Sequence, residues 1–310
     1  MEGMRPMTYY AGLDVGGTSA RLKLTRRDDA ELGEYFGQGC TLNVEGYEEA
    51  RSRYRTLVLE ALKKNNLAPQ ECAGVCVAAS GVDGEETQAQ CRRIFEEMGF
   101  AKTRLIVCND CEVLLRCSAS ADIVLVAGTG SIAVGRKEDG SYLRCGGFGH
   151  ILSDEGSAYD IAVRTFRLVG DHIDGRAFCP ILYRLFTEAT GLTQLNELNV
   201  YINDHILERP QIARFAHLPE QAAAQGDEAA NALLEGRADA LFRLLCDTAK
   251  KLGKAEEPVK AWLWGSVVAQ GSDMEQRLQR RAQASGCVTL MHPPYTALEA
   301  AVLTARGLSV

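Results

Sequence analysis

Three glycine turns, each directly behind a run of apolar residues, constrain the fold of this 310-residue chain more than any other feature. They are D-V-G-G-T-S at 14–19, G-T-G-S at 128–131 and W-G-S-V at 264–267. Glycine is needed where a backbone reaches positive φ or lies close to a ligand, and the exposed N–H groups of such turns can bind phosphate oxygens. A single turn of this kind is weak evidence, because many tight turns bind nothing. Three of them, each behind a predicted buried strand, favour an α/β protein in which these turns are candidate ligand-binding segments.

The pattern around the first turn repeats once along the chain. Residues 9–38 predict a hairpin with a glycine tip and a third strand, and an amphipathic helix follows over 46–65. Buried strands at 73–80 and 104–108 then alternate with helices over 86–100 and 111–119. At 121–135 a strand, a glycine turn and a returning strand start the pattern again. We therefore expect two lobes, 1–120 and 121–310, and leave open whether the last helix, about 296–310, packs on the first lobe.

The second lobe is expected to be richer in helices. A helix is predicted over 155–169, closed by Gly170, and a long helix over 227–252 with an apolar stripe. A buried strand at 259–266 leads into the third glycine turn. Residues 171–224 are expected to be mostly helical.

Composition narrows the location and the partners. The net charge is −7, which disfavours nonspecific attraction to nucleic acid or anionic lipid. No apolar run approaches the roughly 18 residues that a membrane span needs, and the first residues lack the pattern of a signal peptide. We therefore expect a cytoplasmic protein with small-molecule partners, without nucleic acid or membrane.

Eleven cysteines, an odd number, are scattered over strand and helix patterns rather than set in a disulfide or zinc-binding spacing. The one C-x-x-C, Cys108 to Cys111, has no second pair of ligands to complete a metal site. We interpret the cysteines as reduced thiols that are mostly buried.

The chain lacks a P-loop and a dinucleotide-binding G-x-G-x-x-G. Its three turns, with Asp14 leading the first, instead resemble in order the phosphate 1, phosphate 2 and adenosine segments of the actin, hexokinase and heat-shock-protein ATPase superfamily. A closer resemblance, to N-acetylglucosamine kinases and the BadF/BadG/BcrA/BcrD ATPases, is carried by GTGSIAVG at 128–135, GGFGHILSDEGSAY at 146–159 and A-x-x-G-D-x-x-A at 223–230. The resemblance implies two ribonuclease H-like (actin-like ATPase) domains with an interdomain cleft.

By this resemblance the chain phosphorylates an amino sugar with ATP and Mg²⁺, first of all N-acetylglucosamine to its 6-phosphate, and we expect it to be a homodimer. Asp14 would hold Mg²⁺ through water, because Mg²⁺ dehydrates reluctantly. The nucleotide would be bound mainly by backbone groups of the three turns: Gly16, Gly17, Thr18, Ser19, Gly128, Thr129, Gly130, Gly265 and Ser266.

A hydroxyl that attacks phosphorus must lose its proton. Asp110 is the candidate general base, because it follows a buried strand at the position where the resemblance implies the catalytic Asp. An Asp before a helix could equally be an N-cap, and the two roles are compatible. The residues implied to bind the sugar are Asn43, Ser80, Asp110, Thr129, Gly146, Gly147 and Asp154. For Asn43 and Ser80 a role in capping a loop is as good an interpretation as a sugar contact.

Other interpretations stay open. An activator ATPase of the 2-hydroxyacyl-CoA dehydratase type shares the implied fold, but we cannot match the cysteines to its iron–sulfur site. Glucosamine and N-acetylmuramic acid compete as substrates, whereas a noncatalytic sugar sensor is disfavoured because Asp14, Asp110 and the G-T-G-S turn are all present. Ser153 and Asp160 replace a glycine and a tryptophan usual in the family, which leaves the sugar undecided. We favour packing roles for His150 and for Trp262 and Trp264, but the sequence does not decide whether they touch a ligand.

Overall fold

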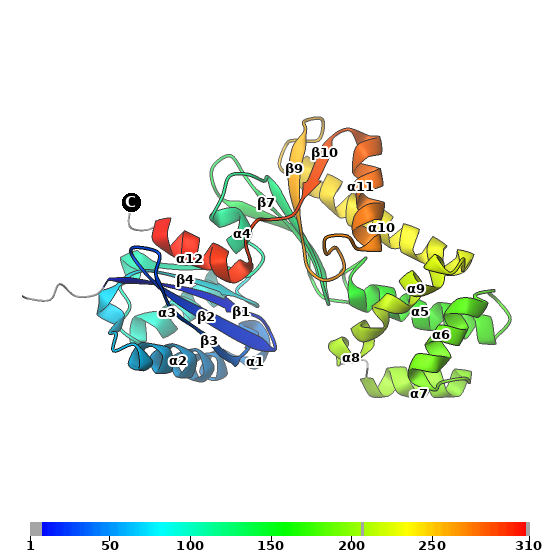
Figure 1. Cartoon of the computed structure of the whole chain (residues 1–310), viewed down its shortest axis with the longest axis horizontal. Helices are drawn as coiled ribbons and strands as arrows, with labels where there is room; N and C mark the ends of the chain where they lie inside the picture. The colour runs from blue at the N-terminus through cyan, green and yellow to red at the C-terminus, as the bar shows by residue number, and fades with distance from the viewer. Residues whose placement is uncertain (1–7, 206–207, 308–310) are drawn as a thin grey trace, which may run out of the picture. The chain divides into compact units, whose positions relative to one another are not determined.

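The computed structural model describes residues 8–205 and 208–307. The chain divides into two compact units, unit 1 (residues 1–119 and 293–310) and unit 2 (residues 120–292) (Figure 1). Within the described residues, no helix is both long and apolar enough to span a membrane.

Unit 1 is built on a five-stranded mixed sheet in the order β3-β2-β1-β4-β5. Its strands are β1 (Tyr9–Val15), β2 (Ser19–Arg26), β3 (Glu31–Gln38), β4 (Cys72–Ala79) and β5 (Leu105–Asn109). The first three pair antiparallel, whereas β4 runs parallel to β1 and β5 parallel to β4. β1 and β4 are buried almost throughout because helices cover both of their faces, and the edge strand β3 has no fully buried residue.

Helices cover the two faces of this sheet. They are α1 (Leu42–Glu45), α2 (Tyr47–Lys64), α3 (Glu85–Glu97), α4 (Val113–Arg116) and α12 (Ala297–Gly307), with short 3₁₀ turns at Pro69–Glu71 and Lys102–Arg104. Tyr54 of α2 and Phe95 of α3 meet in the core, with ring centroids 6.3 Å apart. On the other face α12 lies directly on β1 and β4 (Figure 1). Only glycine fits at that contact, because a Cβ at Gly12 or Gly74 would lie 2.6 or 2.1 Å from the α12 backbone.

Unit 2 repeats the topology of the first sheet. Its strands are β6 (Ile123–Ala127), β7 (Ser131–Arg136), β8 (Tyr142–Gly146), β9 (Val259–Trp264) and β10 (Val288–Met291). The order is β10-β9-β6-β7-β8, with β6, β7 and β8 antiparallel and β9 and β10 parallel to β6. The α/β class predicted from the sequence is therefore confirmed, and each unit has a hairpin with a glycine-containing turn at the start of its sheet.

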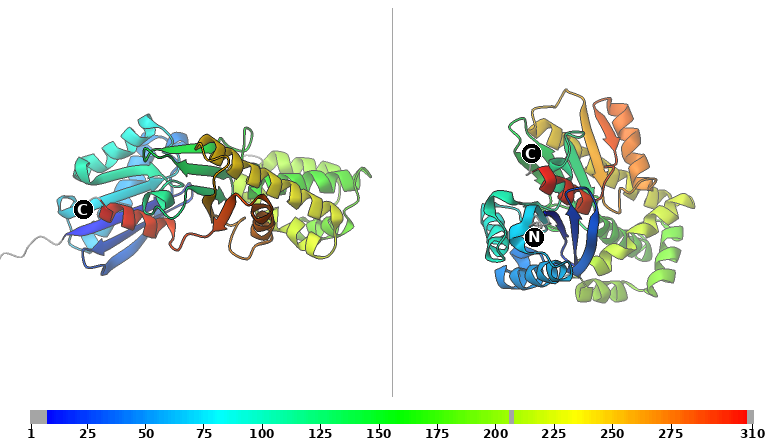
Figure 2. Two further views of the ribbon diagram at one scale, coloured as in Figure 1. Left: turned by 90° about the horizontal axis from the view of Figure 1, so that it is seen from above. Right: turned by 60° about the vertical axis from the view of Figure 1, so that its left-hand side comes forward.

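Unit 2 adds a large helical group. Its helices are α5 (Ala158–Ile173), α6 (Pro180–Thr190), α7 (Leu195–His205), α8 (Arg209–Ala213), a 3₁₀ turn (Arg214–His217), α9 (Leu218–Ala224), α10 (Glu228–Lys251) and α11 (Asp273–Ser285). The long helix α10 packs on the sheet and on α5, α9 and α11, so it joins the two parts of the unit (Figure 2). Phe166 of α5 centres the helical core, with its ring 4.8 Å from that of Phe186 and 5.6 Å from that of Phe215.

Two predicted boundaries and one omission are corrected by the structure. Helix α5 begins at Ala158 rather than at 155, because Asp154 and Gly156 have positive φ and the Ser157 hydroxyl caps the helix by accepting a hydrogen bond from the Asp160 N–H. Gly170 does not close this helix, which continues to Ile173. It lies in a close contact with α7, where an added Cβ would be 3.5 Å from Leu195. The sequence analysis assigned neither α11 nor β10.

Candidate active site

In unit 1 the candidate side chains gather where parallel strands end. Asp14 is the penultimate residue of β1, Ser80 directly follows β4, and Asp110 directly follows β5. Because the carboxyl ends of adjacent parallel strands lie at one edge of a sheet, these residues occupy the place where α/β proteins bind ligands. Asn43 of α1 and Asp83, in the loop between β4 and α3, lie beside them through hydrogen bonds of Asp83 with Asn43 and Asn109. We call Asp14, Asn43, Asp83 and Asp110 the strand-end group.

Asp110 has the properties of a proton acceptor. Burial, together with the neighbouring negative charges of Asp14 and Asp83, raises the pKa of its carboxyl to about 6, against the opposing effect of hydrogen bonds from Cys111. The thiol Sγ lies 3.5 Å from the Asp110 Oδ1. Helix α4 begins only at Val113, so Asp110 is not its N-cap. A carboxyl with a pKa near neutrality can take up and release a proton at physiological pH.

Asp83 was not selected from the sequence, yet it links Asn43 to Asn109, the residue before Asp110. Its Oδ1 accepts a hydrogen bond of 2.8 Å from the Asn109 Nδ2, and its Oδ2 accepts one of 3.3 Å from the Asn43 Nδ2. On the other side Asn43 lies against the backbone, since a Cβ at Gly81 would be 2.6 Å from the Asn43 Oδ1. The Asn43 side chain is therefore held between Asp83 and the segment that follows β4.

The other predicted unit 1 residues lie on or beside the first turn. The Asp14 carboxylate pairs with Arg21, its neighbour across the β1–β2 ladder, at 2.6 Å. The Gly16 N–H donates to the Ser19 carbonyl within the turn, whereas Gly17, Thr18 and Ser19 are exposed.

Ser80 joins two segments through its backbone. Its N–H donates to the Val15 carbonyl at 2.8 Å, and its carbonyl accepts a weaker hydrogen bond from the Leu42 N–H at 3.4 Å. Both bonds involve the backbone, so the Ser80 hydroxyl is not needed to hold β1 and α1 in place.

In unit 2 the turn at 128–131 rests on the start of α5. The carbonyls of Gly128 and Thr129 accept hydrogen bonds from the N–H groups of Ala158 and Tyr159, at 2.8 and 3.4 Å. The Ser131 hydroxyl donates to the Glu155 carbonyl at 2.9 Å. The turn is thereby fixed by backbone groups of the α5 entry.

Asp154 lies directly against this turn. Its side chain is only 5% exposed, its Oδ1 accepts a hydrogen bond from the Ser131 N–H at 3.3 Å, and its Oδ2 pairs with Arg209 at 2.8 Å. A φ of 71° is unusual for a residue other than glycine and aims the side chain at the turn. Arg209, like Asp83, was not selected from the sequence, because it lies 55 positions from Asp154 in an irregular helical stretch.

Gly146 and Gly147 stand at the end of β8. Gly146 pairs with Ile132 of β7, and the Gly147 carbonyl accepts a hydrogen bond from Arg144. Gly147 has a φ of 70°, and a Cβ there would lie 2.8 Å from the Ile132 side chain. Glycine is therefore required by the local packing at this position.

In the third turn, too, the local backbone packing requires a glycine. Gly265 has a φ of 109°, and a Cβ there would lie 2.4 Å from the Ala127 carbonyl oxygen at the end of β6. Ser266 is exposed, Trp264 is half-buried, and Trp262 is buried in the core of unit 2. The packing role favoured for Trp262 is thus confirmed.

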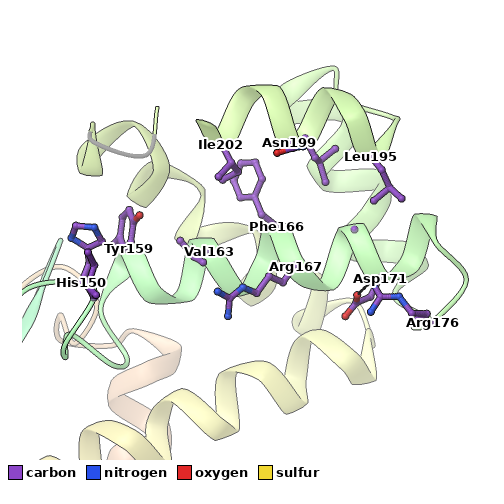
Figure 3. A pocket seen from close by; sticks show the side chains of 13 residues that line it. His150, Tyr159, Val163, Phe166, Arg167, Asp171, Arg176, Leu195, Asn199 and Ile202 are labelled. Atoms are coloured by element: carbon purple, nitrogen blue, oxygen red, sulfur yellow. Dashed lines mark ion pairs between the residues drawn. The ribbon is translucent and has the colours of Figure 1, made fainter. Parts of the chain in front are cut away.

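A cavity of about 650 Å³, not foreseen from the sequence, runs along α5 and α7 (Figure 3). Its walls are mainly apolar, with Phe166 and Ile202 among them, and Asp171 and Arg176 line its far end. At the near end the His150 ring packs edge-on against Tyr159, with centroids 4.9 Å apart. His150 therefore makes the packing contact that the sequence analysis favoured.

The two departures from the family pattern are both used structurally. The Ser153 hydroxyl accepts a hydrogen bond from the Phe148 N–H at 2.7 Å and closes the loop before Asp154. Asp160 pairs with Arg164 and, from α10, with Arg237, at 2.8 and 2.9 Å. Asp160 therefore fastens the start of α5 to α10.

The cysteines are mostly buried. Of the eleven, all within the described residues, only Cys246 and Cys287 are exposed. Across residues 8–205 and 208–307, no group of three or more His, Cys, Asp or Glu side chains is arranged to hold a metal ion.

Comparison with known proteins identifies the family to which the chain belongs. The chain is 28% identical to an N-acetylmuramic acid/N-acetylglucosamine kinase of Clostridium acetobutylicum, over 84% of this chain and 86% of the relative. It is 26% identical to an N-acetyl-D-glucosamine kinase of Dictyostelium discoideum, with the same two coverages. Its fold matches the crystal structure of a proposed N-acetylglucosamine kinase of Chromobacterium violaceum with a TM-score of 0.74 and 23% identity, over 96% of this chain and 99% of that one. Residues 11–305 match the BadF/BadG/BcrA/BcrD ATPase family, and the chain belongs to that family.

Proposed function

We propose that this protein transfers the γ-phosphoryl group of ATP to a hydroxyl of an amino sugar, with N-acetylglucosamine as the first candidate and its 6-phosphate as the product. The observation that carries the proposal is Asp110, a half-buried carboxyl with a pKa of about 6 that directly follows the parallel strand β5. The kinases named among its relatives and the family membership support the same reaction.

In the proposed reaction Asp110 takes the proton of the acceptor hydroxyl. The sugar oxygen forms a bond to the γ-phosphorus while the bond from that phosphorus to the β–γ bridging oxygen breaks, leaving ADP and a sugar phosphate. Such a transfer needs positioning and charge stabilisation more than covalent chemistry. Asn43 and Ser80 would position the sugar from unit 1, and Asp154 would accept hydrogen bonds from its ring hydroxyls, with Gly146 and Gly147 beside it.

The phosphates would be bound by backbone and hydroxyl donors of the two hairpin turns. In unit 1 these are Gly17, Thr18 and Ser19, which are exposed, whereas the Gly16 N–H is used within the turn and would contribute through shape. In unit 2 they are Gly128, Thr129 and Gly130, in a turn already fixed by α5. Gly265 and Ser266 would lie against the adenosine.

Mg²⁺ fits the strand-end group. The charges of Asp14 and Asp83 are close enough to raise the pKa of Asp110, so the group creates a negative potential that attracts a cation. Asp14 would hold the ion through water, since Mg²⁺ retains several waters and needs few protein ligands. When bound, the ion would offset the negative charge of the phosphates.

The proposal is tested by ADP release with ATP and Mg²⁺ over N-acetylglucosamine, glucosamine, N-acetylmuramic acid, N-acetylmannosamine and glucose. Strong turnover on one amino sugar, absent without sugar, supports the kinase and names its substrate. No stimulation by any sugar contradicts it. An iron-loaded brown protein from anaerobic preparation would then favour the activator-type ATPase.

We also propose that the protein is a homodimer. Phe178 and Val200 in the helical group of unit 2 are 80% and 59% exposed, and large exposed apolar side chains often belong to protein interfaces. Light scattering should give about twice the chain mass of 33.7 kDa. A mass equal to that of one chain at micromolar concentration would contradict the dimer.

A further inference from the structure

Arg209 brings a guanidinium group to the G-T-G-S turn of unit 2. It is the first residue of α8, and its Nη2 donates to the Asp154 Oδ2 at 2.8 Å. Its Cζ lies 5.9 Å from the centre of the Tyr159 ring, close enough for a cation–π contact. The guanidinium is therefore fixed by a carboxylate and by an aromatic ring of α5.

Both members of this ion pair touch the turn itself. A Cβ at Gly130 would lie 2.9 Å from the Asp154 Oδ2 and 3.0 Å from the Arg209 Nη2. The other carboxylate oxygen accepts from the Ser131 N–H. The Asp154–Arg209 pair thus lies on the turn to which the proposed function assigns phosphate contacts, and in which Thr129 is also expected to contact the sugar.

The charges around Asp154 act in opposite directions. The pKa of the Asp154 carboxyl lies above its ordinary value, because burial, with a smaller contribution from Glu155, outweighs the lowering effects of the Ser131 N–H, Arg209 and His150. A carboxylate has about four acceptor positions. Asp154 uses one on each oxygen for Ser131 and Arg209, so an ionised Asp154 can still accept hydrogen bonds from hydroxyl groups.

Stability alone does not explain the pair. A buried ion pair is often no more stabilising than apolar residues of similar volume, because both charges lose their hydration. The side chain of Asp154 is 5% exposed, whereas that of Arg209 is 32% exposed, although its Nε is buried without a hydrogen-bond partner among the described residues. The cost of desolvation therefore falls mainly on the Asp154 carboxylate, and a requirement for an oriented, ionised carboxylate accounts for it.

We propose that Arg209 is a positioning residue for the acceptor sugar: it holds Asp154 ionised and oriented so that this carboxylate accepts hydrogen bonds from the hydroxyl groups of an amino sugar. The inference rests on the proposed kinase function. The ligand class it assigns to Asp154 is a polyhydroxylated ring without a required anionic substituent.

The test compares Arg209→Gln and Arg209→Lys with a matched control, Arg214→Gln. Arg214 lies in the following turn, where it donates to the Tyr201 hydroxyl and covers the Phe215 ring without contacting Asp154. Thermal unfolding first establishes that each variant is folded. KM for sugar, KM for ATP and kcat are then measured between pH 5.5 and about 8.5 with N-acetylglucosamine and with N-acetylmuramic acid, which carries a carboxylate.

Arg209→Gln should raise KM for both sugars about tenfold and leave KM for ATP unchanged, as expected for weakening one charge-assisted hydrogen bond. Losing the guanidinium raises the pKa of Asp154, so the loss of sugar affinity on acidification should begin at a higher pH than in the wild type. Arg209→Lys keeps the charge and should restore the wild-type pH dependence, and Arg214→Gln should match the wild type throughout.

Three results would overturn the inference. A loss confined to N-acetylmuramic acid would mean that Arg209 binds a substrate carboxylate. An equal fall in kcat for both sugars at unchanged KM would mean that it stabilises the transferring phosphoryl group. Wild-type kinetics in a folded Arg209→Gln would mean that it has no role in the reaction. If the wild type phosphorylates neither these sugars nor the wider panel, the proposed function itself fails, independently of Arg209.

Discussion

The two units share one sheet topology but carry different chemistry on it. In unit 1 the candidate site includes side chains at or just after strand ends, among them three carboxylates, and the charges of Asp14 and Asp83 raise the pKa of Asp110. In unit 2 it consists of a backbone turn that is fixed by the entry of α5, with Asp154 as its one buried carboxylate. The same hairpin and parallel strands can therefore present charge in one copy and backbone donors in the other.

This difference predicts different responses to mutation. In unit 1, removing a charge should alter rate and pH dependence while the backbone stays in place. In unit 2, adding a methyl group should alter affinity by changing geometry. The following predictions test this contrast.

The largest effect is expected from Asp110→Asn, which removes the proposed base without changing its size. Turnover should fall about 10²- to 10⁴-fold, with the affinity for ATP unchanged. The folded-state pKa, about 6, lies above the ordinary 3.8, so the ionised carboxyl destabilises the fold above pH 6 and this penalty disappears as the pH falls below 3.8. The variant should therefore melt at a higher temperature than the wild type at pH 8.

The exposed Asp28, in the turn between β2 and β3, provides the control. Asp28→Asn should leave turnover unchanged and should not raise the melting temperature. Full turnover in Asp110→Asn would show that Asp110 is not the base. The proposed difference between a charged site in unit 1 and a backbone site in unit 2 would then fail.

A smaller effect is expected at the unit 2 turn, where two glycines form a matched pair. A Cβ at Gly130 would press on Asp154 and Arg209, whereas one at Gly128 would meet no protein atom within 4 Å. Gly130→Ala should raise KM for the sugar about tenfold, because small displacements of positioning groups are costly. Gly128→Ala should weaken ATP binding while the melting temperature stays at the wild-type value.

Calorimetric titration with a nonhydrolysable ATP analogue measures the nucleotide affinity of Gly128→Ala. Because the protein itself leaves room at Gly128, any loss of affinity there reports a contact with the nucleotide. Unchanged nucleotide affinity in Gly128→Ala would argue against phosphate binding by the 128–131 turn.

Asp83→Asn should have a moderate effect that is visible mainly in the pH profile. The Asp83 charge raises the pKa of Asp110, so neutralising it should move the acid limb of kcat/KM, expected near pH 6 in the wild type, to lower pH. Sugar KM should rise about threefold, because Asn43 loses a charged hydrogen-bond partner. A profile that coincides with the wild type would show that Asp83 does not influence the base.

The smallest effect is expected at the two exposed thiols. Cys246→Ser and Cys287→Ser should leave kinase turnover and its sugar preference unchanged, because neither residue belongs to the strand-end group or to the unit 2 turn. Loss of bound iron together with ATPase activity in these variants would instead support the activator-type alternative.

The sequence predicted the parts that depend on local pattern. The apolar runs with glycine tips gave both hairpins, and the amphipathic stripe gave α10 to within one residue at each end. The start of α5 was misplaced because the positive φ of Asp154 is set by its contacts with Ser131 and Arg209, which no local rule contains.

The candidate site also divides into residues that the sequence could identify and residues that it could not. Asp14 and Asp110 could be selected because each lies at the end of a predicted strand, at a position to which the family resemblance assigns a role. Asp83 and Arg209 could not, because their importance lies in partners 26 and 55 positions away. Selecting Asp83 and Arg209 would have required knowing their hydrogen-bond partners, which only the folded structure brings close.

The most direct test of the account follows the phosphorus atoms themselves. Phosphorus-31 NMR of the wild-type protein with ATP, Mg²⁺ and N-acetylglucosamine should show ADP and a sugar phosphate ester formed in equal amounts, with Asp110→Asn producing neither. ADP formed together with inorganic phosphate and an unchanged sugar would contradict phosphoryl transfer to the sugar.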